Sequence, residues 1–287
     1  MSATQEIKSI KRLGIIAGRG SLPAYLVSIC KRDGIEPFII GFHGQTPESL
    51  MHKTPHHMWV SLGCAGKIIE FFKDNQVSDL VLIGGITRPA WNEIRPDFKG
   101  IQILSRIGLK AMGDNSLLSA IKAELQNEGF ELHGIHKFCD KLLMQKGAIG
   151  KYQIPEDDQE TVNLGINTSQ AIGALDIGQS VIVQNGMVIG VEAIEGTDTL
   201  IDRCSPLLRK GHNGILVKTC KPQQDQDLDL PTIGVETVIN AHKAGLTGII
   251  LQAEKVLIID PQSIAEYADK YKIFIAGVEI PSGNQKH

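Results

Sequence analysis

The sequence contains no run of about 18 consecutive apolar residues, the length that a helix needs to cross a bilayer, so no segment is expected to span a membrane. Residues 1–12 lack the apolar stretch typical of a signal peptide. The five cysteines are scattered and odd in number, and no CxxC pair occurs, which favours reduced thiols. Together these absences predict a cytoplasmic protein.

Basic residues form no block and the formal net charge is -3, so electrostatic capture of nucleic acid is not expected. The sequence also has no internal repeat and no low-complexity tract. Its 287 residues can bury about three quarters of the unfolded surface, which is enough for one large domain or two small ones. We expect two.

The first half alternates between strand-like and helix-like patterns, which is typical of a parallel, doubly wound sheet. The strand-like runs are 13–17, 37–41, 59–62 and 80–83, and the helical patterns between them include 22–33 and 65–75. In the second half, Asn185-Gly186 lies between two apolar runs and predicts a β-hairpin. The fold class is therefore α/β, with a Rossmann-like N-terminal domain and a mixed α/β C-terminal domain.

The expected boundary lies where periodicity fades after Ile135. We predict an N-terminal domain over residues 1–135, a linker over 136–158 and a C-terminal domain over 159–287.

A glycine-rich turn follows the first strand-like run, where a nucleotide could approach the backbone closely. Pro23 replaces the third glycine of a dinucleotide fingerprint, and the second strand ends without an acid for a ribose, so NAD is disfavoured. A tight turn without a ligand explains a lone GxG equally well. An arginine behind two glycines at the end of run 80–83 is a further possible anion contact, although a surface arginine explains it equally well. The candidate substrate contacts here are Gly18, Gly20, Ser21 and Arg88.

Two histidine pairs, His56-His57 and His133/His136, could bind a metal only if a carboxylate joined them in space, and we favour structural roles for both. Residues 97–111 form a basic amphipathic pattern with Lys99, Arg106 and Lys110. Such a helix can lie on an anionic membrane, although a helix packed on the sheet explains the same pattern.

Residues 218–234 carry the most informative polar pattern, two lysines and three alternating aspartates after an apolar strand. An extended chain would place these aspartates on one side, where like charges repel unless a cation or a proton lies among them. Lysines can bind phosphate oxygens and carboxylates can bind Mg²⁺, although a solvated acidic turn explains the composition too. The residues are Lys218, Lys221, Asp225, Asp227 and Asp229.

A second acidic cluster, Glu192, Glu195 and Asp198, follows the predicted hairpin. Thr197 could cap the helical pattern after it and leave free amides for an anion. Each of these acids, taken alone, is explained by a capping or surface role. Two clusters meeting at the same strand ends would form a divalent metal site.

Several segments, in order, resemble the UDP-2,3-diacylglucosamine pyrophosphatases of the LpxI type. They are IAGRGSLP (16–23), GGITRP (84–89), GD followed by LL (113–118), VIGVEAIEGTD (188–198) and LVKxxKPxQDxxxDLPTIG (216–234). The resemblance covers nearly the whole chain, and the combination of EGTD with KPxQDxxxDLP is specific.

The resemblance implies hydrolysis of the pyrophosphate bond of UDP-2,3-diacylglucosamine to UMP and 2,3-diacylglucosamine 1-phosphate (lipid X) in lipid A synthesis. Water attacks the α-phosphorus, and a divalent metal, Mg²⁺ or Mn²⁺, takes part. It also implies two domains with the lipid held between them, a homodimer, and peripheral attachment to the cytoplasmic face of the inner membrane.

The key aspartate of the family corresponds most naturally to Asp229, with Asp225 as the second choice. Two positions before it, where a basic residue is expected, this chain has Asp227. We assign Asp229 to metal binding or to orienting or deprotonating the water, since a diphosphate needs charge neutralisation and positioning. Asp225, Glu195 and Asp198 are further candidate ligands, Lys218 and Lys221 candidate phosphate contacts, and Thr197 a candidate substrate contact.

Two other functions are compatible with parts of the pattern. A nucleotide-dependent oxidoreductase or transferase would use the turn at Gly18, but the ribose acid is missing. In a non-catalytic nucleotide-sugar sensor, the carboxylates would be structural.

Overall fold

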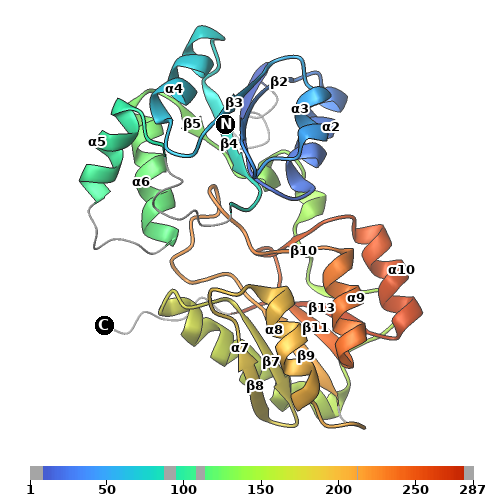
Figure 1. The fold of residues 1–287 in the computed structure, drawn as a ribbon. Coiled ribbons are helices and arrows are strands. Elements are labelled where there is room, and N and C mark those ends of the chain that lie inside the picture. The colour runs from blue at the N-terminus through green and yellow to red at the C-terminus, as the bar shows by residue number, and fades with distance from the viewer. Residues whose placement is uncertain (1–8, 87–94, 108–113, 212, 281–287) are drawn as a thin grey trace. The chain divides into compact units, whose positions relative to one another are not determined.

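The computed structural model describes residues 9–86, 95–107, 114–211 and 213–280. The chain forms two compact units, each with its own sheet and core (Figure 1). Unit 1 comprises Met1–Asp140 and Asp225–Asp229, and unit 2 comprises Lys141–Gln224 and Leu230–His287. The predicted fold class is confirmed, because the first sheet is parallel and the second is mixed.

Unit 1 is built on a parallel five-stranded sheet of order β3-β2-β1-β4-β5. Its strands are β1 (Arg12–Ala17), β2 (Glu36–Phe42), β3 (His57–Val60), β4 (Asp79–Ile83) and β5 (Glu131–Leu132). The central strands are apolar on both faces, as expected for a parallel sheet covered on both sides. The strand order reverses between β1 and β4, which is where such sheets bind ligands beyond the carboxyl ends of the strands.

Helices cover both faces of this sheet, with α2 and α3 on one side and α4, α5 and α6 on the other (Figure 1). They span Leu22–Asp33 (α2), Glu48–His52 (α3), Ala65–Asp74 (α4), Phe98–Ile107 (α5) and Asp114–Asn127 (α6). A buried cluster that includes Phe72, Leu80 and Phe130 fills one side of the sheet. Leu228, far away in the sequence, belongs to the same cluster.

Unit 2 is built on a six-stranded sheet of order β6-β13-β11-β9-β7-β8. The three central strands β13, β11 and β9 are parallel, and antiparallel strands flank them. The predicted hairpin is confirmed as β7 and β8, whose turn residues Asn185 and Gly186 both have positive φ. The strands span Gly147–Ile149 (β6), Ser180–Gln184 (β7), Met187–Val191 (β8), Gly214–Lys218 (β9), Leu246–Gln252 (β11) and Phe274–Val278 (β13). A separate parallel pair joins β10 (Thr232–Ile233) to β12 (Leu257–Ile258).

Helix α7 (Gln159–Ala174) covers one face of this sheet, and α8 (Thr197–Cys204), α9 (Val235–Ala244) and α10 (Pro261–Tyr271) cover the other (Figure 1). The two faces have separate buried clusters, with Val162 of α7 in one and Leu200 of α8 in the other.

The stretch expected to be a linker, residues 136–158, contains short ordered elements. Three are 3-10 turns, η2 (Ile135–Lys137), η3 (Asp140–Leu142) and η4 (Glu156–Asp158), and the fourth is β6, which pairs antiparallel with β13. A three-residue edge strand is too short for a periodic pattern in the sequence.

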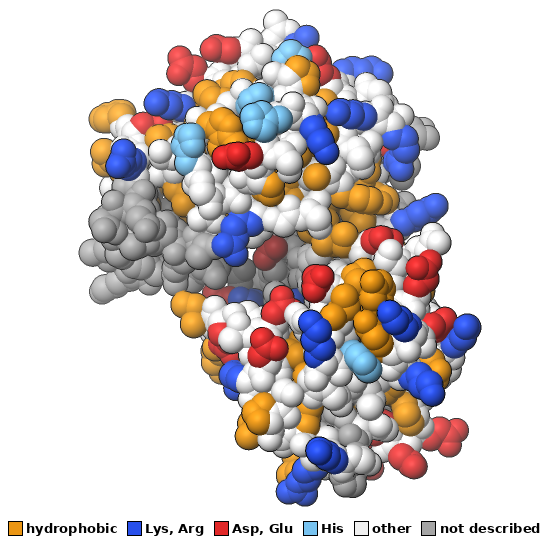
Figure 2. Space-filling model, turned by 45° about the vertical axis from the view of Figure 1, so that its right-hand side comes forward, with side chains coloured by type: hydrophobic (Ala, Val, Ile, Leu, Met, Phe, Trp, Pro, Cys, Tyr) orange, Lys and Arg blue, Asp and Glu red, His pale blue; other side chains and the backbone are white. Residues whose placement is uncertain are grey.

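Among the described residues, no helix is long and apolar enough to cross a membrane. Basic and acidic side chains are interspersed over the face of the molecule drawn in Figure 2.

Candidate functional site

The glycine turn after β1 packs against the turn after β4, at the point where the strand order reverses. The Gly18 N–H donates to the Ile83 carbonyl (2.8 Å), and a Cβ on Gly18 would lie 2.5 Å from the Gly85 carbonyl oxygen. Gly18 therefore has a structural reason to lack a side chain. Gly20, with φ of 94°, and the exposed Ser21 follow at the N-terminus of α2. Arg88 lies outside the described residues.

Unit 2 contains a continuous hydrogen-bonded chain of side chains that runs from Lys218 through Thr197 to Glu192. The Lys218 ammonium donates to the Thr197 hydroxyl (2.9 Å), which donates to the Glu192 carboxylate (2.8 Å). The Ser180 hydroxyl is a third neighbour of the Thr197 Oγ1, at 3.2 Å. Because a hydroxyl has one donor and two acceptor sites, these three partners occupy its full capacity.

This chain of contacts is buried, since Lys218 and Glu192 are each 6% exposed. Its residues come from the end of β9, the segment after β8 and the first turn of α8. The structure thus brings the predicted Lys218 and Thr197 together and adds Glu192, which the sequence pattern marked only as one of three similar acids. Burial of Glu192 could not be read from the sequence.

The other predicted residues of unit 2 have separate partners. Glu195 makes an ion pair with Arg203 (2.9 Å), and Asp198 accepts a long hydrogen bond from Asn240 (3.4 Å). The backbone amides of Glu195 itself and of Ala193, together with Arg203, lower the pKa of Glu195 despite a smaller opposing effect of desolvation. Lys221 is paired with Asp176 at 2.6 Å.

The aspartate segment belongs to unit 1, whereas Lys218, Lys221, Glu195 and Asp198 belong to unit 2. The expectation of an extended chain is wrong, because residues 225–229 form a turn. The Asp225 carbonyl accepts from the N–H groups of Leu228 (3.0 Å) and Asp229 (3.1 Å), and its carboxylate accepts from the Asp227 N–H (3.0 Å). Aspartate often closes turns in this way.

Lysines lie among the carboxylates of this turn. From the sequence, a cation or a proton is expected at this place, to offset the repulsion between the aspartates. Lys122 of α6 pairs with Asp225 (2.5 Å), and Lys137 of η2 pairs with Asp227 (2.8 Å). Desolvation alone would raise the pKa of Asp227, but Lys137, the Gly134 N–H and Lys122 together hold it below its usual value. Asp229 is exposed at the end of the turn.

A group that could hold a metal ion lies elsewhere in unit 1. Asp79, Glu131 and His133 offer ligand atoms within 4.8 Å of one another; Asp79 and Glu131 begin β4 and β5, and His133 follows β5. The His133 Nε2 is 2.8 Å from an Asp79 oxygen. Although desolvation favours a higher value, hydrogen bonds from His133 and Ser78 keep the pKa of Asp79 low. Carboxylates thus do lie next to His133, but at the opposite end of the strands from the glycine turns.

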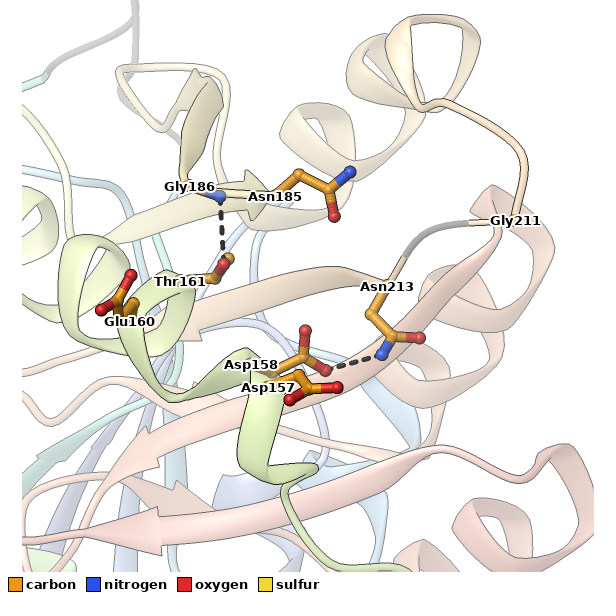
Figure 3. A pocket seen from close by; sticks show the side chains of 8 residues that line it. All are labelled: Asp157, Asp158, Glu160, Thr161, Asn185, Gly186, Gly211 and Asn213. Carbon is orange, nitrogen blue, oxygen red and sulfur yellow. Dashed lines mark hydrogen bonds between the residues drawn. The ribbon is translucent and has the colours of Figure 1, made fainter.

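A pocket in unit 2 lies between the start of α7, the β7–β8 turn and the loop before β9 (Figure 3). Its lining includes the acids Asp157, Asp158 and Glu160, and Asp158 accepts a hydrogen bond from Asn213 (2.6 Å). None of the predicted site residues lines it. Strand β9 runs from this pocket to Lys218 at its other end, and an acidic lining does not suit a diphosphate.

Helix α5, the described part of the predicted basic helix, packs against α4 and α6. Lys99 pairs with Glu124 (2.6 Å) and Glu128 (2.7 Å), and Arg106 pairs with Glu124 (2.7 Å). Acids of α6 and the residue after it therefore neutralise these two cations, while Lys110 lies outside the described residues.

Two domain models of one protein family match consecutive parts of this chain. Residues 12–142 match the LpxI N-terminal domain, and residues 145–276 match the LpxI C-terminal domain. The chain belongs to the LpxI family. One relative is the UDP-2,3-diacylglucosamine pyrophosphatase LpxI of Caulobacter vibrioides, which is 32% identical over 277 residues, covering 94% of this chain and 98% of the relative.

Proposed function

We propose that this protein is a UDP-2,3-diacylglucosamine hydrolase of lipid A biosynthesis, which cleaves the pyrophosphate bond and releases UMP and 2,3-diacylglucosamine 1-phosphate. The supporting observation is the relative that bears this activity in its name and aligns with 94% of this chain. Water attacks the α-phosphorus.

Asp229 is the residue to which we assign the reacting water or the metal. It is exposed, and its N–H is fixed by the Asp225 carbonyl. Lys218 and Lys221 contact phosphate oxygens, with Thr197 and Glu192 orienting Lys218. Gly18, Gly20, Ser21 and Arg88 contact the substrate. A positioned carboxylate can act as a general base, which typically contributes about 10² to 10⁴-fold in rate.

The candidate donors fit a Mg²⁺ or Mn²⁺ ion in part. Carboxylate oxygens are the ligands such ions prefer, and Asp229 is an exposed carboxylate. Asp225, Glu195 and Asp198 are further candidate ligands, but Asp225 already contacts Lys122 and the Asp227 N–H, and Glu195 contacts Arg203. When bound, the ion would neutralise the charge that develops on the diphosphate.

Turnover of UDP-2,3-diacylglucosamine in oxygen-18 water, with and without chelator, tests the reaction. We expect chelator-sensitive release of UMP that carries the label. Label in the sugar phosphate would show attack at the β-phosphorus instead, and absence of UMP in the presence of Mg²⁺ or Mn²⁺ would refute the proposed activity.

Asp229→Ala should lower kcat by at least about 100-fold while the protein stays folded, because the water or the metal loses its partner. Circular dichroism of the variant provides the folding control. Near-normal turnover would remove Asp229 from the reaction.

We also propose that the protein acts as a homodimer, peripherally on the cytoplasmic face of the inner membrane, where its lipid-linked substrate lies. The apolar Phe98 and Ile101 are exposed on α5, next to Lys99. Flotation with anionic vesicles tests this attachment. Unchanged binding after neutralisation of Lys99, Arg106 and Lys110 would exclude the helix as the attachment point, and light scattering gives the oligomeric state.

A further inference from the structure

The turn at residues 225–229 comes late in the sequence, yet it belongs to unit 1 and is held there by several contacts. Lys122 and Lys137 pair with its two carboxylates, Asp225 and Asp227. Between them, the Leu228 side chain is 8% exposed and belongs to the core cluster of unit 1.

The backbone of the turn also approaches unit 1 closely. The Gly134 N–H donates to the Asp227 carboxylate (3.2 Å), and a Cβ on Gly134 would lie 2.7 Å from the Gln226 carbonyl oxygen. Lys122 reaches Asp227 as well, at 3.9 Å. Contacts from α6 and from the segment 134–137 thus converge on four consecutive residues.

These ion pairs differ from ordinary surface pairs, which contribute little because water and salt screen them. The Lys122 side chain is only 18% exposed, and the Asp227 side chain is 28% exposed. Partial burial strengthens the attraction between charges, and each of these carboxylates also accepts a backbone N–H.

We propose that Lys122 and Lys137 are positioning residues for Asp229. The two lysines hold the turn by pairing with Asp225 and Asp227. The Asp225 carbonyl then fixes the main chain of Asp229 by accepting its N–H. The inference rests on the proposed function, since it takes Asp229 as the residue that acts on the substrate. It also gives Asp227 a role, as the partner of Lys137.

A small displacement of the turn should have a large effect on the rate of catalysis. A displacement of about 1 Å in a group that positions a reactant can lower the rate by about 100-fold. Loss of the Lys137–Asp227 pair should therefore reduce kcat more than it changes KM, because the substrate contacts of Lys218 and Lys221 remain.

Charge reversal tests the pair without altering Asp229 or its candidate co-ligand Asp225. We expect Lys137→Glu and Asp227→Lys each to lower kcat at least about tenfold, with KM changed less than about threefold. The double variant restores an attraction between positions 137 and 227. A lysine at 227 cannot accept the Gly134 N–H and lies near Lys122, so kcat should recover in part, to at least about threefold above that of either single variant. Lys73→Glu breaks another ion pair in unit 1, with Glu128, and serves as the control that keeps its kcat.

Hydrogen exchange at the amides of Leu228 and Asp229 gives a readout independent of activity, since both donate to the Asp225 carbonyl. Exchange should be faster in each single variant than in the wild type, and slower in the double variant than in either single variant. If Lys137→Glu does not fold, Lys137→Met should show the loss and Lys137→Arg should retain activity.

Three results would overturn the inference. They are an unchanged kcat in both folded single variants, amide exchange that does not respond, and a double variant no better than the single ones. Absence of UMP release by the wild-type protein refutes the proposed function instead, and the exchange measurement still decides whether the lysines hold the turn.

Discussion

Replacing Thr197 with valine removes the hydroxyl that links two buried ionisable side chains while keeping nearly the same shape. That hydroxyl accepts from Lys218, donates to Glu192 and has Ser180 as its third neighbour. We expect Thr197→Val to lower the stability of unit 2 and the rate of UMP release together, since the same contacts orient Lys218.

The magnitude follows from the partners. A hydrogen bond to a charged group contributes about 1.5–3 kcal/mol, and two such bonds are lost. Glu192 keeps the Gln179 N–H as a donor (3.1 Å), so the losses do not add fully. We therefore expect a loss of about 2–4 kcal/mol in the free energy of unfolding.

Thr197→Ser is the matched control, because it keeps the hydroxyl and loses one methyl group, at a cost of about 1 kcal/mol. Urea denaturation followed by circular dichroism compares the two variants. If valine costs no more than serine, the chain from Lys218 to Glu192 does not stabilise the unit, and our reading of its geometry is wrong.

Three further predictions concern unit 1. Gly18→Ala should lower the melting temperature more than Gly85→Ala, because its Cβ meets the Gly85 carbonyl whereas a Cβ on Gly85 meets no atom within 4 Å; calorimetry showing the reverse order would contradict this. The folded-state pKa of Asp227 lies below its unfolded value of about 3.9, so its contribution to stability is present above that pH and is lost as the pH falls through the folded pKa. Asp227→Asn should therefore flatten the acid side of the stability profile measured by urea midpoints, and a parallel profile would argue against the ion pair. His133→Gln should leave the Mg²⁺ concentration for half-maximal activity within about threefold of wild type, because we assign the metal to Asp229; a tenfold shift, about 1.4 kcal/mol, would place the metal at the Asp79 group.

Local patterns predicted the parts of the fold that depend on local sequence. Alternating strand and helix patterns predicted the parallel sheet of unit 1, and Asn185-Gly186 predicted the β7–β8 hairpin, because that dipeptide adopts the positive φ values of the turn. The glycines after β1 indicated close approach. Their partner is the neighbouring backbone turn, which no local pattern specifies.

The candidate site was harder to predict because its contacts are long-range. The alternation of Asp225 and Asp227 indicated an extended chain, but Lys122 and Lys137, about 90 residues or more away, pair with them in a turn. Likewise, nothing local distinguishes the buried Glu192 from the neighbouring Glu195, which pairs with Arg203. Charge patterns show which groups need partners, whereas the fold decides which partners they find.

The path of the chain through residues 225–229 affects any attempt to separate the two family domains. A fragment ending at residue 142 contains every strand of the first sheet but lacks Leu228, so it would fold around a vacant position in its core, with Lys122 and Lys137 deprived of counter-ions. Such a fragment should be aggregation-prone, and co-expression with the remainder of the chain should rescue it by complementation. A cut between the two family domains therefore does not separate the two folding units, because unit 1 is built from two separate segments of the polypeptide.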